Sequence, residues 1–170
     1  MGALDFTAYQ DGTDVSQAFR DAVENAQYEY GHRGDTGTIA EKDEYQIISD
    51  TALSMDDAEA LAERIMRADE HPVQDKWGPA GAIPVLSDQR HVRVTVPQST
   101  QGYATPEEAA AAILAENGQL LPGESVERRT CGVFERCPRT SRIRSGEFDV
   151  TLRGGPTEHR GWLFFGSASY

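Results

Sequence analysis

The hydrophobic positions of residues 15–30 recur with the spacing of an amphipathic helix. Apolar side chains stand at positions i, i+3, i+4 and i+7, namely Val15, Ala18, Phe19, Ala22, Val23 and Ala26. This period lines one face of an α-helix and leaves the other face polar. Asp14 and Gln17 have the spacing of a capping box at the start, and Gly31 follows the end. The pattern predicts a helix over 15–30 with one buried stripe.

Two further helices are predicted from their end signals. One spans residues 56–68, with Ser54 as the capping oxygen and Pro72 beyond its end. The other begins at Thr105, which is followed by a proline and two glutamates. That order supplies an N-cap hydroxyl, a proline at the first helical position and a carboxylate that can bond back. An Asn-Gly pair at 117–118 predicts its end.

Short runs of β-prone residues alternate with these helices. Residues 4–9, 45–49 and 91–96 are bounded by Gly, Asp or Pro, and valines alternate with polar residues in the third run. After residue 124 no helical spacing occurs. Four more strands are predicted there: 126–134, 141–144, 147–152 and 161–168.

This order predicts an α+β fold, in which three helices pack on a largely antiparallel sheet. Strands and helices alternate as β-α units in the first part of the chain, and a β-meander follows at the C-terminal end. This order favours the α+β class over a doubly wound parallel sheet. A chain of 170 residues is long enough to bury a full hydrophobic core. We therefore expect one domain over 1–170, with a division into subdomains 1–88 and 89–170 as the alternative.

The acidic residues are concentrated in the first half of the chain. The formal net charge is −12, with 19 acidic and 6 basic residues in 1–88 but 9 acidic and 10 basic residues in 89–170. An acidic half repels phosphates at long range, which argues against nonspecific nucleic-acid binding. The same charge suggests one alternative function, that of an acidic protein that mimics nucleic acid and inhibits a DNA-binding protein.

No segment predicts a membrane span. The longest apolar run is 109–115, far short of the roughly 20 residues that a bilayer span needs. The N-terminus lacks the basic and then apolar pattern of a signal peptide. We expect a soluble protein without a membrane partner.

The segment 31–42 is the first candidate for a binding site. It holds three glycines, two threonines and several ionisable groups after the end of a predicted helix. Glycine permits close backbone approach, so successive N–H groups can form an anion-binding nest, to which Arg33 and Lys42 add charge. The loop follows a helix, whereas a P-loop precedes one. A glycine-capped turn with solvated charges is the alternative interpretation.

The segment 75–84 is a second candidate, predicted as an irregular loop rich in Gly and Pro. Long irregular loops are often functional. Trp77 can either stack on a base or sugar ring or close one end of the core. We predict that the loops 31–42 and 76–84 converge on one ligand.

The second half adds cysteines and arginines. Cys131 and Cys137 have no histidine nearby that would complete a zinc pattern, so they are either two free thiols or a disulfide across a hairpin. Six arginines gather in the same region: Arg128, Arg129, Arg136, Arg139, Arg142 and Arg144. They predict either an anion-binding strip or ion pairs with the acidic half.

The sequence gives no positive support for an enzyme. The four histidines have no metal-binding spacing, and no nucleophile elbow is present. We therefore expect no cofactor and no metal. A small enzyme that uses His32 or His91 with a nearby carboxylate remains an alternative.

Three runs, 31–42, 76–81 and 161–166, together resemble those of uncharacterised small proteins encoded by bacteriophages of actinobacteria. In those proteins an aromatic residue often stands where this chain has Asp35. The resemblance implies a phage origin and a location in the host bacterial cytoplasm, with no catalytic residues to transfer.

We therefore predict a non-enzymatic phage accessory protein that binds a small anionic, nucleotide-like ligand or a host protein through the loops 31–42 and 76–84. The candidate ligand-binding residues are His32, Arg33, Thr36, Thr38, Lys42 and Trp77.

Overall fold

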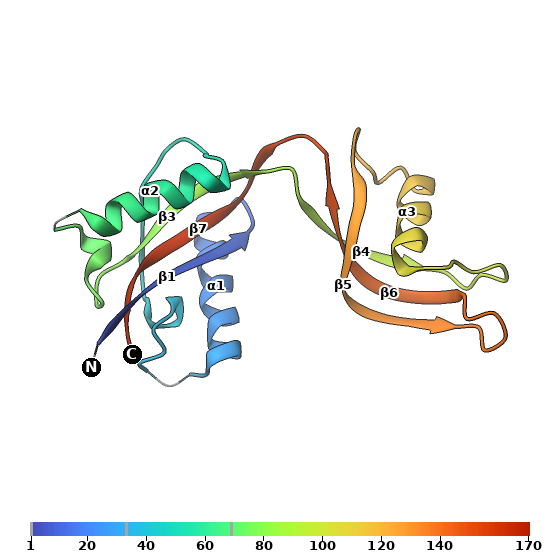
Figure 1. The fold of residues 1–170 in the computed structure, drawn as a ribbon, viewed down its shortest axis with the longest axis horizontal. Helices are drawn as coiled ribbons and strands as arrows, with labels where there is room; N and C mark the ends of the chain where they lie inside the picture. The colour runs from blue at the N-terminus through green and yellow to red at the C-terminus, as the bar shows by residue number, and fades with distance from the viewer. Residues whose placement is uncertain (1, 33, 69) are drawn as a thin grey trace. The chain divides into compact units, whose positions relative to one another are not determined.

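The protein divides into two compact units, each with its own sheet (Figure 1). The computed structural model describes residues 2–32, 34–68 and 70–170. The first unit comprises the chain up to Ser87 and again from Glu158 to Tyr170, and the second comprises Asp88–Thr157. The second unit is thus an insertion between two strands of the first. The predicted α+β class, with three helices and largely antiparallel strands, is confirmed, but the strands form two sheets rather than one.

The sheet of the first unit has four strands in the order β1-β7-β3-β2. These are β1 (Ala3–Asp11), β7 (Glu158–Ser169), β3 (Ala80–Ser87) and β2 (Tyr45–Ile47). The strand β7 is antiparallel to both of its neighbours, and β2 is parallel to β3. The strands β1 and β2 therefore form the two edges.

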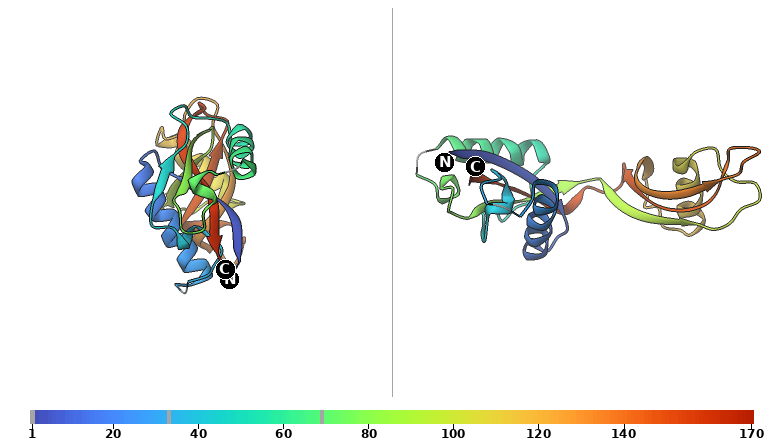
Figure 2. Two further views of the ribbon diagram at one scale, coloured as in Figure 1. Left: turned by 90° about the vertical axis from the view of Figure 1, so that its left-hand side faces the viewer. Right: turned by 90° about the horizontal axis from the view of Figure 1, so that it is seen from below.

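The helices α1 (Val15–Tyr30) and α2 (Met55–Arg67) cover opposite faces of this sheet (Figure 2). Alternate residues of β7 show the division. Phe164 packs with Phe19 of α1, with ring centroids 5.6 Å apart, whereas Phe165 belongs to the cluster that contains Ala62 of α2. The strand is consequently buried on both faces, which explains its almost continuous apolar sequence.

The strand β3 corrects the sequence prediction of an irregular loop over 75–84. A 3-10 helix, η2 (Pro72–Gln74), precedes it, and residues 80–85 are all buried. A central strand with both faces covered shows no period of two, so the alternation that marks a strand is missing. Gly81 is required because a Cβ atom there would collide with the ring of Phe165.

The predicted C-terminal meander is also rearranged. The predicted strands 141–144 and 147–152 merge into one strand, β6 (Ile143–Arg153), which begins two residues later than predicted, and β7 leaves the meander to join the first unit. Gly146 does not form a turn. It permits close packing, since a Cβ atom there would lie 2.7 Å from the Cβ of Phe134.

The second unit is a three-stranded sheet in the order β4-β6-β5 with one helix. The elements are β4 (Arg90–Val96), α3 (Pro106–Glu116), β5 (Ser125–Arg136) and β6. Residues of α3 and of one sheet face form the core, which includes Leu114, Phe148 and Val94. No helix of this unit, all of whose residues are described, covers the other sheet face.

The predicted helix starts are confirmed by their hydrogen bonds. The Asp14 carboxylate accepts from the N–H of Gln17 at 2.7 Å, and the Thr105 hydroxyl accepts from the N–H of Glu108 at 3.1 Å. Ser54 caps α2 in the same way. Among the described residues, no helix is both long and apolar enough to cross a membrane.

Candidate functional site

The segments 31–42 and 76–84 meet at the side chain of Lys42. Its ammonium group donates to the carbonyl oxygens of Asp75, Lys76 and Gly78, at 3.1, 3.2 and 2.8 Å. An ammonium group has three N–H donors, so all of them are used. The residue is only 3% exposed, and this burial lowers the pKa of Lys42. Lys42 thus holds the two loops together and does not face a ligand, contrary to its predicted role.

The two predicted threonines organise the first loop internally. The Thr38 hydroxyl caps a 3-10 helix, η1 (Ile39–Glu41), by accepting from the N–H of Ala40 at 3.2 Å. The Thr36 hydroxyl donates to the Glu41 carboxylate at 2.9 Å, and the Thr36 N–H bonds to the same oxygen at 3.1 Å. These hydroxyls therefore shape the loop instead of being directed at an anion.

Gly37 anchors this loop to the end of β7. Its N–H donates to the carbonyl oxygen of Ser169 at 2.7 Å, and its φ of 68° lies in the left-handed region. Of the remaining predicted residues, His32 is exposed on the loop and Arg33 lies outside the described residues.

Trp77 stands at the exposed rim of the second loop. The residue is 69% exposed, so it does not close the end of the core. The backbone N–H of Trp77 donates to the Asp75 carboxylate at 2.9 Å, and this bond orients the turn. The ammonium nitrogen of Lys76 lies 5.2 Å from the centroid of the indole ring, within the range of a cation–π contact.

A groove of about 450 Å³ lies between the two loops. Its lining comprises Ala40, Glu41, Asp43, Glu44, Trp77 and Gly78. Three of these six residues are acidic, and within the described part of the chain no basic residue lines the groove. The site therefore combines an exposed indole with carboxylates. Sequence reasoning overlooked Asp43 and Glu44, which adjoin the predicted loop.

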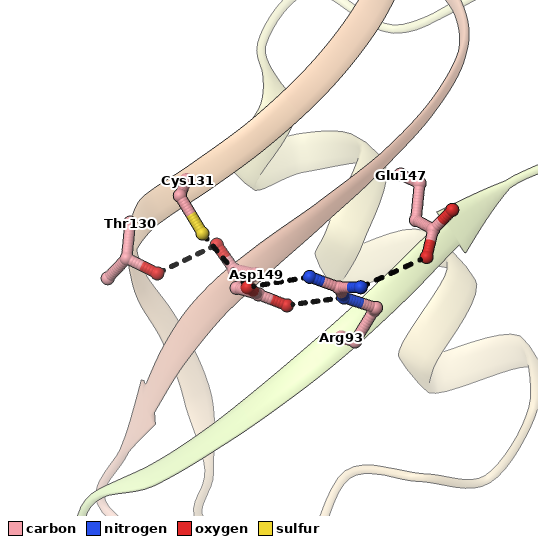
Figure 3. Close-up of polar contacts among 5 residues, drawn as sticks. All are labelled: Arg93, Thr130, Cys131, Glu147 and Asp149. Carbon is pink, nitrogen blue, oxygen red and sulfur yellow. Dashed lines mark hydrogen bonds and ion pairs between the residues drawn. The ribbon is translucent and has the colours of Figure 1, made fainter. Parts of the chain in front are cut away.

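A second polar cluster lies on the uncovered face of the sheet in the second unit (Figure 3). The strand register places Arg93, Asp149 and Cys131 side by side on three adjacent strands. Arg93 Nε and Nη2 donate to the two oxygens of Asp149, at 2.9 and 3.2 Å, and Nη1 donates to Glu147 at 3.4 Å. The Cys131 thiol donates to the Asp149 carboxylate at 2.9 Å.

This cluster keeps its carboxylate charged and its thiol neutral. The hydrogen bonds from Arg93 and then from Cys131 lower the pKa of Asp149 to about 2. The bond to Asp149 raises the pKa of the Cys131 thiol. A nucleophilic cysteine requires the opposite shift, because the thiolate is the reactive form. The arrangement supports a cross-strand ionic link rather than nucleophilic chemistry.

Cys137 is the more acidic of the two thiols. It precedes the turn between β5 and β6, where hydrogen bonds from the side chain and N–H of Thr140, and from the N–H of Arg139, lower its pKa to about 7. Cys131 and Cys137 are both free, so the predicted disulfide alternative is not formed.

Three of the six arginines singled out in the sequence, Arg129, Arg136 and Arg142, have partners within the second unit. Arg142 donates to the carbonyl oxygens of Gln101 and Gly102, at 3.0 and 3.1 Å. The guanidinium carbons of Arg129 and Arg136 lie 5.3 and 5.1 Å from the ring centroid of Phe134. These three arginines thus bond to backbone or aromatic groups nearby instead of pairing with the acidic half.

The histidines proposed for an enzymatic alternative lie in different units. His32 is in the first, whereas His91 is in the second, with Nδ1 3.1 Å from the Thr151 hydroxyl. Across the described ranges, no three His, Cys, Asp or Glu side chains are grouped so as to hold a metal ion.

Comparison with known proteins adds no relative. No family model, curated protein or solved structure matches this chain. Its function has to be inferred from its own residues.

Proposed function

We propose that this chain is a non-enzymatic binding protein whose groove between 31–42 and 76–84 accepts a cationic side chain of a partner protein. The observation that supports it is the exposed Trp77 ring beside Glu41, Asp43 and Glu44 in one groove. A guanidinium or ammonium group gains both cation–π attraction from the indole and charge-assisted hydrogen bonds from carboxylates.

The charge of the groove favours a cation over the anionic ligand expected from the sequence. Lys42 is buried and uses its three donors on carbonyl oxygens, while the carboxylates of Asp43 and Glu44 are exposed at the rim. A phosphate placed there meets three carboxylates, and no basic residue is among the described residues that line the groove. Like-charge contact at an interface disfavours binding.

The contact between Lys76 and Trp77 gives a local precedent. An ammonium nitrogen 5.2 Å from the ring centroid means that this indole already accepts a cation at one of its faces. A partner cation can take the same position by displacing the Lys76 side chain, or it can occupy the opposite ring face.

The net charge of the whole first unit also favours a cationic over an anionic partner. That unit holds 19 acidic and 7 basic residues, a net of −12, whereas the second unit holds 9 of each. Such a field attracts basic partners and speeds their encounter. With the phage origin that the sequence resemblance implies, we propose a basic protein of the host bacterium as the partner.

The test is titration calorimetry with a hexa-arginine peptide and with a panel of nucleotides. We expect the peptide to bind and Trp77→Ala to weaken it at least fivefold, while Trp77→Phe retains most of the affinity because a phenyl ring keeps the cation–π contact. The double variant with Asp43→Asn and Glu44→Gln should weaken binding of the peptide further. Micromolar nucleotide binding that these variants leave unchanged would overturn the proposal.

The alternative of an acidic nucleic-acid mimic rests on the same charge but needs no groove. A mimic binds through its overall field, so its affinity should fall steeply with salt and be insensitive to Trp77. Equal binding by wild type and Trp77→Ala at every salt concentration would favour the mimic.

A further inference from the structure

The strand β1 leaves one edge of the first sheet unpaired. It pairs over nine residues with β7, from Ala3 opposite Ser169 to Asp11 opposite Gly161, without a register shift. In the described part of the chain no strand pairs with its other side (Figure 1). An unpaired edge presents a row of backbone donors and acceptors to any extended chain.

The register shows which backbone groups point outward. The N–H of Gly12 donates to the carbonyl oxygen of Arg160, which continues the register of β1 and β7 by one pair. In an antiparallel ladder, residues alternate between bonding to the neighbour and pointing away from it. The even-numbered residues therefore bond to β7, and the N–H and C=O groups of Asp5, Thr7 and Tyr9 face the open edge.

This edge lacks three of the usual protections against pairing, a lysine, a proline and a bulge, and its two charged residues, Asp5 and Asp11, are acidic. Natural edge strands are blunted by Lys, Pro or bulges. The sequence of β1, ALDFTAYQD, contains neither Lys nor Pro, and its pairing with β7 has no bulge. Nine residues at about 3.3 Å each form an edge of about 30 Å, long enough for a peptide strand.

A cavity opens beside β1 on each face of the sheet. The cavity on the α1 side, about 280 Å³, is lined by Phe6 and Ala8 with Ala22, Asn25 and Ala26 of α1. The cavity on the α2 side, about 270 Å³, has Met66 and Phe165 in its lining and the acids Asp5, Glu59 and Glu63 around them. An added strand directs its side chains alternately to the two faces.

We infer that β1 binds an extended basic segment of a partner protein by strand addition. Alternate Lys or Arg side chains would enter the α2-side cavity, where an apolar lining suits their aliphatic stems and the carboxylates suit their charged ends. The intervening side chains, of moderate size and apolar, would enter the α1-side cavity. The inference uses a surface distinct from the Trp77 groove, so it stands or fails independently of the function proposed above.

Net charge favours a basic segment over a second copy of this chain as the strand that pairs with β1. Pairing of two β1 edges would bring together two units that each carry a net charge of −12. Like charges placed opposite each other destabilise strand pairs. A basic segment is instead attracted to these carboxylates, because its charge has the opposite sign.

The test compares Thr7→Pro with Thr7→Val in binding an eight-residue peptide of alternating lysine and valine. Proline removes an outward N–H, and edge strands tolerate proline on their solvent side. Valine keeps the N–H and the strand preference. All variants are made in a Trp77→Ala background, so that binding of lysine at the Trp77 groove does not contribute. In that background we expect at least a tenfold loss of affinity for Thr7→Pro and less than a twofold change for Thr7→Val.

Amide hydrogen exchange provides the second readout. Bound peptide should slow exchange at Asp5, Thr7 and Tyr9 at least tenfold, whereas Phe6 and Ala8 are protected with or without it. If Thr7→Pro does not fold, two peptides decide the matter, one N-methylated at its lysines and one at its valines, since the peptide whose methylated nitrogens face β1 should not bind. Equal affinity of both methylated peptides and the unmethylated form, or protection of the odd-numbered amides by dimerisation alone, would overturn the inference.

Discussion

The buried ammonium group of Lys42 lies 2.8 Å from the carbonyl oxygen of Gly78, and this contact joins two loops that are 36 positions apart in the chain. The bond has two consequences. It holds the walls of the acidic groove at a set spacing, and it removes from the groove the cation that the sequence offered to an anionic ligand.

Replacing Lys42 by methionine should destabilise the protein by about 2–4 kcal/mol. The substitution keeps the aliphatic stem but leaves three partly buried carbonyl oxygens without their charged donor. The measurement is the free energy of unfolding in urea. Lys76→Met is the matched control, and we expect it to stay within about 0.5 kcal/mol because its ammonium group lies over an exposed indole. A Lys42→Met protein as stable as this control would contradict the role of the contact.

The Arg93–Asp149 link should make stability depend on pH in acid. The pKa of Asp149 is about 2 in the folded protein against an ordinary 3.8, so the unfolded chain takes up the proton first as the pH falls. The contribution is therefore complete above pH 4 and is lost between pH 4 and pH 2. Because solvent screens this exposed pair, we expect a small contribution.

The variant Asp149→Asn tests this link. Its difference in unfolding free energy from wild type should be present at pH 6, shrink in 1 M salt and vanish near pH 2. A difference that is the same at pH 6 and pH 2 would show that packing, and not charge, is responsible.

Cys137 should react with iodoacetamide before Cys131 at pH 7. The Cys137 pKa of about 7 makes about half of its thiol a thiolate, whereas the bond to Asp149 keeps Cys131 protonated. We expect a rate ratio of about tenfold or more, measured by mass spectrometry of the labelled peptides. Thr140→Val, which removes the hydroxyl bonded to the sulfur, should slow the labelling of Cys137. Faster labelling of Cys131 would refute the assignment.

Gly81→Ala should cost about 1–3 kcal/mol of stability. An added Cβ atom collides with the buried ring of Phe165, and core overpacking has this magnitude. Gly34→Ala is the control, because the nearest atom to its Cβ is a flexible Glu41 oxygen at 3.8 Å. Thermal unfolding of the two variants measures the difference. Equal stability would place β3 outside the core.

The candidate site was only partly predictable. The sequence indicated that 31–42 and 76–84 share one site, and Lys42 joins the two segments. It did not indicate that Lys42 is buried, because a lysine in a loop rich in glycine is usually solvated. The acidic character of the groove could be seen only after Asp43 and Glu44 were placed beside Trp77.

Local interactions determined what the sequence predicted correctly. A helix is stabilised by residues within a few positions of one another, so the caps at Asp14, Ser54 and Thr105 and the apolar spacing were sufficient to place all three helices. The half-buried strand at 91–96 likewise showed its alternation directly.

The tertiary structure decided which strands are buried on both faces and which partners they take. The strand β3 has no alternation because α1 and α2 cover both of its faces, and β7 pairs with β1 across some 150 positions of sequence instead of continuing the meander. Such pairings depend on the shape and burial of the complete sheet, so the local sequence pattern does not predict them.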